Sequence, residues 1–179
     1  MLHEIIIAGF GGQGVMSMGQ LLAYAGMIEN KHVSWLPSYG PEQRGGTANV
    51  SVIISDEPVG SPVISHPTTA IVLNKPSFDK FEPLVIPGGV LIVNSSLIDV
   101  KSTRQDITII EVSASEIANE LGEPKVANSI ILGAFLEISK AVSPESVIES
   151  LKKVLPERRH NLIPVNQLAL EKGAQIVNN

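Results

Sequence analysis

The chain has 179 residues, 44% of them hydrophobic, and a formal net charge of −5 at pH 7. This length and composition favour one folded domain over residues 1–179, and the charge argues against nucleic acid, which needs a basic surface. The chain contains no cysteine, which excludes thiolate-bound iron–sulfur clusters, cysteine zinc sites and disulfides. No apolar run approaches the roughly 18 residues of a membrane span. With no signal peptide before the first predicted strand, we expect a cytoplasmic protein without membrane contact.

Apolar strand-like runs alternate with helical patterns along the chain. Strands are predicted at residues 5–8, 31–36, 47–55, 69–74, 88–94 and 107–112. Helices are predicted at residues 13–29, 76–84, 128–140 and 164–172, with two more begun by a capping box at Ser113 and Glu116 and by Ser143-Pro144. Such a sequence predicts a Rossmann-like α/β fold: an open, mostly parallel sheet with helices on both faces and a helical C-terminal part.

Four residues in the helical part carry smaller predictions. Asn128 is expected to cap the helix at 128–140, and Gly133 inside that helix to permit close packing. Gly173 is expected to end the last helix. The basic run that contains Arg159 is predicted to be a solvated turn or an interface patch.

A glycine-rich segment, GFGGQG at residues 9–14, follows the first strand. Gly9, Gly11 and Gly14 have the G-x-G-x-x-G spacing of a phosphate-binding turn between a strand and a helix, and the N–H groups at such a helix start attract anions. A nicotinamide site also needs a carboxylate at the end of the second strand, where residues 35–38 read Trp-Leu-Pro-Ser. Two interpretations remain open: a plain strand-to-helix turn, and a site for a phosphate-bearing group other than NAD.

A second unusual segment, SYGPEQRGGTANV at residues 38–50, leaves the second strand at the same edge of the predicted sheet. Its prolines and glycines predict a stiff, irregular path. Arg44 offers a planar guanidinium for phosphate or carboxylate, and Tyr39 an amphipathic surface. The alternative is a solvated turn in which Arg44 pairs with Glu42. Asn94, at the end of the fifth predicted strand, is either a binding residue at this edge or an ordinary turn residue.

The histidines are scattered along the chain without a helical pair or an acidic cluster. We therefore predict neither a metal site nor a catalytic residue in this chain.

The two segments together resemble the gamma subunit of 2-oxoacid:ferredoxin oxidoreductases, through GFGGQGV at 9–15 and SYGPEQRGGTANVSVIIS at 38–55. Residues 73–96, 126–138 and 166–173 are similar to the same family, so the resemblance covers essentially the whole chain. The form Y-G-P-E-x-R-G-G-T-A-N is most similar to the 2-oxoglutarate branch.

The resemblance implies a subunit that is inactive alone, in a complex that converts a 2-oxoacid, coenzyme A and oxidised ferredoxin into acyl-CoA, carbon dioxide and reduced ferredoxin. It implies that thiamine diphosphate, magnesium and the iron–sulfur clusters sit on partners, the alpha, beta and delta subunits, and that ferredoxin meets the whole complex. This agrees with the lack of cysteine and of a Gly-Asp-Gly segment in the chain. The chain would bind no cofactor alone, but would wall the active site and help to hold coenzyme A.

The residues expected to approach coenzyme A are Gly9, Gly11, Gly12, Gln13, Gly14, Tyr39, Glu42, Arg44, Gly45, Gly46 and Asn94. The loop at 38–46 is expected to touch either coenzyme A or a partner subunit. Two other functions stay open, a stand-alone nucleotide-binding protein of the same fold and a purely structural adaptor. A homodimer of the isolated chain is a further expectation.

Overall fold

The computed structural model describes residues 1–39 and 47–179, and Glu42, Arg44, Gly45 and Gly46 of the predicted site lie outside them. The strands are β1 Leu2–Phe10, β2 His32–Tyr39, β3 Thr47–Ser55, β4 Thr69–Val72, β5 Val90–Asn94 and β6 Thr108–Val112. The α-helices are α1 Val15–Ile28, α2 Lys75–Phe81, α3 Ala114–Glu120, α4 Ala127–Ser139, α5 Pro144–Val154 and α6 Ile163–Asn178. Short 3₁₀ helices lie at η1 Glu82–Leu84, η2 Pro124–Val126 and η3 Glu157–Leu162.

The strands form one open sheet in the order β2-β3-β1-β4-β5-β6. β1, β4, β5 and β6 pair in parallel, while β3 is antiparallel to both β1 and β2. β3 alone therefore runs against the other five strands, and the predicted open, mostly parallel sheet is confirmed. β2 is longer than predicted, because it continues through Pro37 to Tyr39. Proline is tolerated there since β2 is an edge strand of the described sheet.

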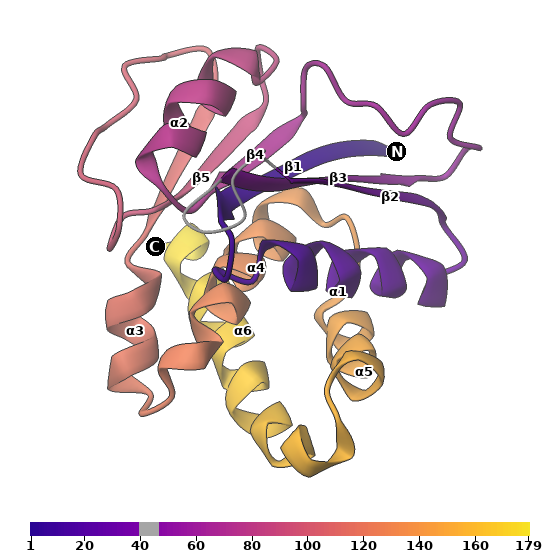
Figure 1. The fold of residues 1–179 in the computed structure, drawn as a ribbon, viewed down its shortest axis with the longest axis vertical. Helices are drawn as coiled ribbons and strands as arrows, with labels where there is room; N and C mark the ends of the chain where they lie inside the picture. The colour runs from indigo at the N-terminus through magenta and orange to yellow at the C-terminus, as the bar shows by residue number, and fades with distance from the viewer. Residues whose placement is uncertain (40–46) are drawn as a thin grey trace.

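Alternate residues of the strands pack into two cores, one on each face of the sheet. Ile5 and Ile7 of β1 belong to the larger core, together with side chains of α1, α4, α5 and α6. Ile6 and Ala8 face the smaller core beneath α2. Figure 1 shows α2 on one side of the sheet and α1, α4, α5 and α6 on the opposite side. The prediction of helices on both faces is therefore confirmed.

Helices α4 and α6 cross at two glycines. A Cβ atom at Gly133 would collide with the carbonyl oxygen of Leu170, and one at Gly173 with that of Ile130. The close packing predicted for Gly133 is confirmed. The prediction that Gly173 ends the last helix is wrong: α6 continues to Asn178, because this glycine serves the helix crossing and not a turn.

Two predicted helix starts are resolved by their hydrogen bonds. The Ser143 hydroxyl accepts from the Ser146 N–H at 3.2 Å, so the predicted cap of α5 is confirmed. The capping box at Ser113 and Glu116 is wrong, because among the described residues the Ser113 side chain makes no capping hydrogen bond to α3. The Ser115 N–H instead donates to Ser96, which joins this helix start to the end of β5.

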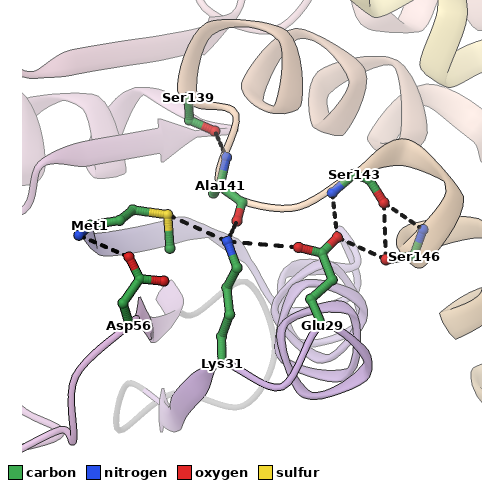
Figure 2. Close-up of polar contacts among 8 residues, drawn as sticks. All are labelled: Met1, Glu29, Lys31, Asp56, Ser139, Ala141, Ser143 and Ser146. Carbon is green, nitrogen blue, oxygen red and sulfur yellow. Dashed lines mark hydrogen bonds and ion pairs between the residues drawn. The ribbon is translucent and has the colours of Figure 1, made fainter.

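A polar network fixes the end of α1 against the start of α5 (Figure 2). One Glu29 carboxylate oxygen accepts from the Ser143 N–H at 2.6 Å and from the Ser146 hydroxyl at 2.8 Å. The Lys31 ammonium lies 3.7 Å from the other oxygen and donates to the Ala141 carbonyl at 2.9 Å. This network joins segments more than 100 residues apart in the sequence and holds α5 against α1.

Among residues 1–39 and 47–179, no helix is both long enough and apolar enough to cross a membrane.

Candidate functional site

The glycine-rich turn lies at the point of the sheet where the helices that follow two neighbouring strands pass to opposite faces. β1 and β4 are parallel neighbours, yet α1 follows β1 onto one face and α2 follows β4 onto the other. In open α/β sheets, ligands bind in the crevice that forms beyond the carboxyl ends of two such strands. The turn at residues 11–14 therefore occupies the usual binding position of this architecture.

The turn needs glycine at its last position. Gly14 has φ 80° and ψ 19°, a left-handed conformation that favours glycine, and it is the N-cap of α1. A Cβ atom there would also meet the side-chain nitrogen of Asn128. Within the described helix α1, the first turn carries no acidic residue and no side-chain cap. The positive end of the helix is thus available to an anion.

The Gln13 side chain ties the turn to the neighbouring strand. Its amide oxygen accepts from the Phe10 N–H at 2.6 Å, and its amide nitrogen donates to the Leu73 carbonyl at 3.3 Å. Both polar groups of Gln13 are therefore used within the chain. Gln13 therefore holds the glycine-rich turn in position, and the ligand contact expected from the sequence stays a prediction.

Asn128 holds the turn from the opposite side. Its side-chain nitrogen donates to the Gln13 carbonyl at 2.8 Å, across 115 positions of sequence. The prediction that Asn128 caps α4 is wrong, because the helix already begins at Ala127 with Val126 as its N-cap. The residue instead connects the helical C-terminal part to the glycine-rich turn.

A cavity of 540 Å³, here called the helix-side cavity, opens beside the turn on the face covered by the long helices. Its apolar wall comes from α1, α4 and α5, through residues that include Met18, Leu21, Leu132, Leu151 and Val154. Its polar lining includes Ser17, Asn94, Asn128 and Asn166, and its charged lining consists, in the described part of the chain, of Lys125 and Arg159. The volume is in the range of small-molecule sites, about 300–1,000 Å³.

Buried hydrogen bonds keep the polar wall of the cavity in place. The Ser129 hydroxyl donates to the Asn166 side chain at 2.6 Å, and the Asn166 amide nitrogen donates to the Leu162 carbonyl at 2.8 Å. Asn94 is 3% exposed and accepts from the Ser96 N–H at 3.2 Å. Asn94 is therefore a turn residue that also lines the cavity, and its binding role stays a prediction.

The structure separates the predicted site residues into two groups. Gly12, Gln13, Gly14 and Asn94 line the helix-side cavity together. The others that it describes, Gly9, Gly11 and Tyr39, do not line it. Tyr39 is 71% exposed at the end of β2, where it pairs with Ala48.

Sequence reasoning missed both charged residues of this cavity. Arg159 lies in η3, in the run predicted to be a solvated turn or an interface patch, and Lys125 lies in η2. Their sequence signal is weak because each cation reaches the cavity from a short 3₁₀ segment far from the glycine-rich turn. Within residues 1–39 and 47–179, no group of three or more His, Asp or Glu side chains is placed to hold a metal ion.

The family model for pyruvate ferredoxin/flavodoxin oxidoreductase matches residues 4–176. The chain belongs to this family. The resemblance drawn from the two sequence segments is thereby confirmed at the level of the family.

Curated relatives of the oxidoreductase family include proteins named after different 2-oxoacids. The ketoisovalerate oxidoreductase subunit VorA of Methanothermobacter marburgensis is 40% identical over 171 residues, which are 96% of this chain and 36% of VorA. The chain thus spans about a third of the length of this relative. The 2-oxoglutarate synthase subunit KorC of Methanocaldococcus jannaschii is 34% identical, over 98% of this chain and 94% of KorC.

Solved structures of the oxidoreductase family share the fold. The gamma subunit of a keto/oxoacid ferredoxin oxidoreductase from Geobacter sulfurreducens has a TM-score of 0.82 at 29% identity, over 98% of both chains. A 2-oxoglutarate:ferredoxin oxidoreductase from Magnetococcus marinus, solved with 2-oxoglutarate, coenzyme A and succinyl-CoA, has a TM-score of 0.88 at 21% identity. The match covers 99% of this chain and 31% of the Magnetococcus chain. At this identity it shows the shared fold alone.

Proposed function

We propose that the chain is the gamma-type component of a 2-oxoacid:ferredoxin oxidoreductase, inactive alone and active in a complex. The observation that carries the proposal is the end-to-end similarity to a gamma subunit, over 98% of both chains. The reaction would consume a 2-oxoacid, coenzyme A and oxidised ferredoxin and release acyl-CoA, carbon dioxide and reduced ferredoxin.

Partner subunits would supply the redox and carbanion chemistry. The alpha, beta and delta subunits would hold thiamine diphosphate, magnesium and the iron–sulfur clusters, and the assembled complex would meet ferredoxin in the cytoplasm. The absence of cysteine from the sequence supports this division, because a cluster needs thiolate ligands. What the chain itself offers is a cavity beside the glycine-rich turn, whose charged lining in the described residues is Lys125 and Arg159.

The contribution of this chain would be to wall the active site and to contact coenzyme A. The cavity beside the turn supports this role, since it combines an apolar wall with two cationic residues. Coenzyme A carries phosphate groups at one end and an uncharged pantetheine arm at the other, which such a lining can accept. The predicted contacts of the loop at 38–46, through Arg44 or Glu42, belong to the same proposal.

The identity of the 2-oxoacid is part of the proposal. Relatives are named for ketoisovalerate, 2-oxoglutarate and pyruvate, and the 2-oxoglutarate branch suggested by the residue pattern stays a prediction. The assay must therefore compare the three acids directly.

The proposal is tested by anaerobic capture of the tagged chain from its native cells. The captured material is assayed for coenzyme A-dependent reduction of ferredoxin with 2-oxoglutarate, pyruvate and 2-oxoisovalerate. We expect cluster-bearing partner subunits and activity on one of these acids. Recovery of the chain alone or as a homodimer, without activity on any of the three, would refute the proposal and favour a stand-alone nucleotide-binding protein. If the captured complex is active, Arg44→Ala and substitutions in the cavity lining test the contact with coenzyme A. A KM for coenzyme A that none of these variants changes would favour a structural adaptor.

A further inference from the structure

Helix α1 has an exposed side that carries no charged residue. Of the six α-helices that the structure describes, α1 is the one whose sequence contains no Asp, Glu, Lys or Arg. The helix is not fully buried, because Tyr24 is 40% exposed and Met27 is 59% exposed. The solvent side of a helix in a globular protein normally carries charged and polar side chains. An exposed side without charge is therefore a distinct feature of α1.

The edge strand β2 extends this uncharged surface. Figure 1 shows α1 between β2 and α5, and two glycines bring the helix close to the strand. A Cβ atom at Gly19 would lie 3.0 Å from the indole nitrogen of Trp35, and one at Gly26 would lie 2.7 Å from the Val33 side chain. Residues 33–39 contain no charged residue either. We name the α1–β2 face by its exposed and partly exposed apolar residues, Tyr24, Met27, Ile28, Val33 and Trp35.

The charged residues that flank this face are bound within the chain. Glu29 and Lys31 follow α1 directly, and both belong to the network of Figure 2 with Ser143, Ser146 and the Ala141 carbonyl. The α1–β2 face therefore combines tyrosine, tryptophan and methionine with a lack of charge. This is the composition that distinguishes the centre of a protein–protein interface from the rest of a protein surface.

We propose that the α1–β2 face is the contact between two copies of this chain, with α1 of one copy packed against α1 of the other across a two-fold axis. Charge favours a second copy as the occupant. Each chain has a net charge of −5, so two copies meet best through a surface that brings no carboxylates together. A partner of opposite charge would be matched by an acidic surface, which this face does not offer. In a two-fold contact the same surface serves both copies, and an uncharged surface is complementary to itself.

Pairing between the backbones of two β2 strands is disfavoured. β2 is an edge strand of the described sheet, but Pro37 has no N–H group to donate to an added strand. Proline protects edge strands against such pairing. The contact therefore rests on the side chains of α1, with Tyr24 and Met27 near the two-fold axis. It does not rest on the proposed function, because it needs neither a ligand nor another subunit.

The test is sedimentation velocity of the purified full chain over a concentration series. We expect a monomer–dimer equilibrium with a roughly micromolar Kd, and a dimer that persists at high salt because its contact is uncharged. Met27→Glu should raise the Kd by at least about tenfold, since it would bury a carboxylate without a partner. Leu168→Glu is the matched control, because Leu168 is also an exposed apolar residue of a helix but lies on α6. It should leave the Kd within about twofold of the unsubstituted chain.

Crosslinking gives a second test that does not depend on the folding of the Met27→Glu chain. The chain contains no cysteine, so a single cysteine introduced by Met27→Cys or Leu168→Cys is the one thiol that a short bismaleimide can link. Met27→Cys should yield a covalent dimer, and Leu168→Cys should stay monomeric under the same conditions.

Four results would overturn the inference. They are a monomer at every concentration, a dimer that high salt dissociates, equal weakening by Met27→Glu and Leu168→Glu, or equal crosslinking of the two cysteine variants. An unchanged circular dichroism spectrum verifies that the Met27→Glu chain is folded. A monomeric purified chain beside an active captured complex would refute this inference alone. Failure to capture any partner subunit, with the dimer results as expected, would refute the proposed function alone.

Discussion

Replacing Glu29 by alanine tests whether the network in Figure 2 holds α5 in place. The substitution removes the acceptor of two short hydrogen bonds, from the Ser143 N–H and the Ser146 hydroxyl. A hydrogen bond to a charged group contributes about 1.5–3 kcal/mol, and the 23% exposure of the Glu29 side chain lowers this figure. We expect the free energy of unfolding to fall by about 2 kcal/mol in total, or roughly 4–8 °C in Tm.

The assay is urea unfolding at neutral pH, with Glu149→Ala as the matched control. Glu149 is a glutamate within α5. Its side chain is 52% exposed, and among the described residues it pairs only with Lys152. An exposed pair of this kind contributes about 0.5 kcal/mol or less. Equal losses for Glu29→Ala and Glu149→Ala would refute the reasoning.

The same network predicts a pH dependence with a definite sign. Partial burial raises the pKa of the Glu29 carboxyl, but the hydrogen bonds from Ser143 and Ser146 and the Lys31 charge outweigh it, so the pKa lies below its ordinary value. A carboxyl whose pKa is lower in the folded state stabilises the fold above the ordinary value of about 4.3. This stabilisation is lost as the pH falls through the folded-state pKa. Glu29→Gln should therefore cost about 1 kcal/mol at pH 7, and the difference should shrink below about pH 4. A difference that grows in acid would contradict the assignment.

Three further substitutions test other contacts. Gly173→Ala should lower the free energy of unfolding by about 2 kcal/mol, because the cost of overpacking at the α4–α6 crossing exceeds the roughly 1 kcal/mol gain in helix propensity. Gly60→Ala, at an open position, is its control in the same urea assay. Asn128→Ala should cost about 1 kcal/mol and shift the amide resonances of Gln13, whose carbonyl it releases; unchanged resonances would contradict the contact. Arg104→Lys should lower Tm by a few degrees, since lysine cannot reproduce the fork that binds Asp106 and two backbone carbonyls; an unchanged Tm would show that the fork contributes nothing.

Local patterns in the sequence were sufficient for most of the fold. Alternating apolar and polar residues predicted β3, and continuous apolar runs predicted β1 and β4. A strand buried on one face needs apolar residues at every second position, and a strand buried on both faces needs them throughout. The errors fell where a residue has two physical uses. Glycine both ends helices and lets them cross closely, and only the partner helix decides between these uses, as at Gly173.

The site was predictable to the extent that it is local in sequence. Four of the predicted residues line the cavity because the glycine-rich turn and the end of β5 meet at the carboxyl edge of parallel strands. Lys125 and Arg159 were not predictable in this way. Exposed cations on short 3₁₀ segments look the same in sequence whether they face water or a ligand, and only the packing of α4, α5 and α6 brings them to the turn.

The glycine-rich turn and the helical part of the chain therefore depend on each other. The carbonyl of Gln13 is held by Asn128 at the start of α4, and the glycine at position 14 leaves room for that side chain. The Glu29 network fixes the N-terminal end of α5 through Ser143. The C-terminal end of the same helix contributes Val154 to the cavity wall. A change at Glu29 should thus shift the backbone amide resonance of Val154 through α5, although Glu29 does not line the cavity. If Glu29→Ala destabilises the chain as expected and leaves the Val154 resonance unchanged, the cavity wall is set by the sheet and α4 without α5.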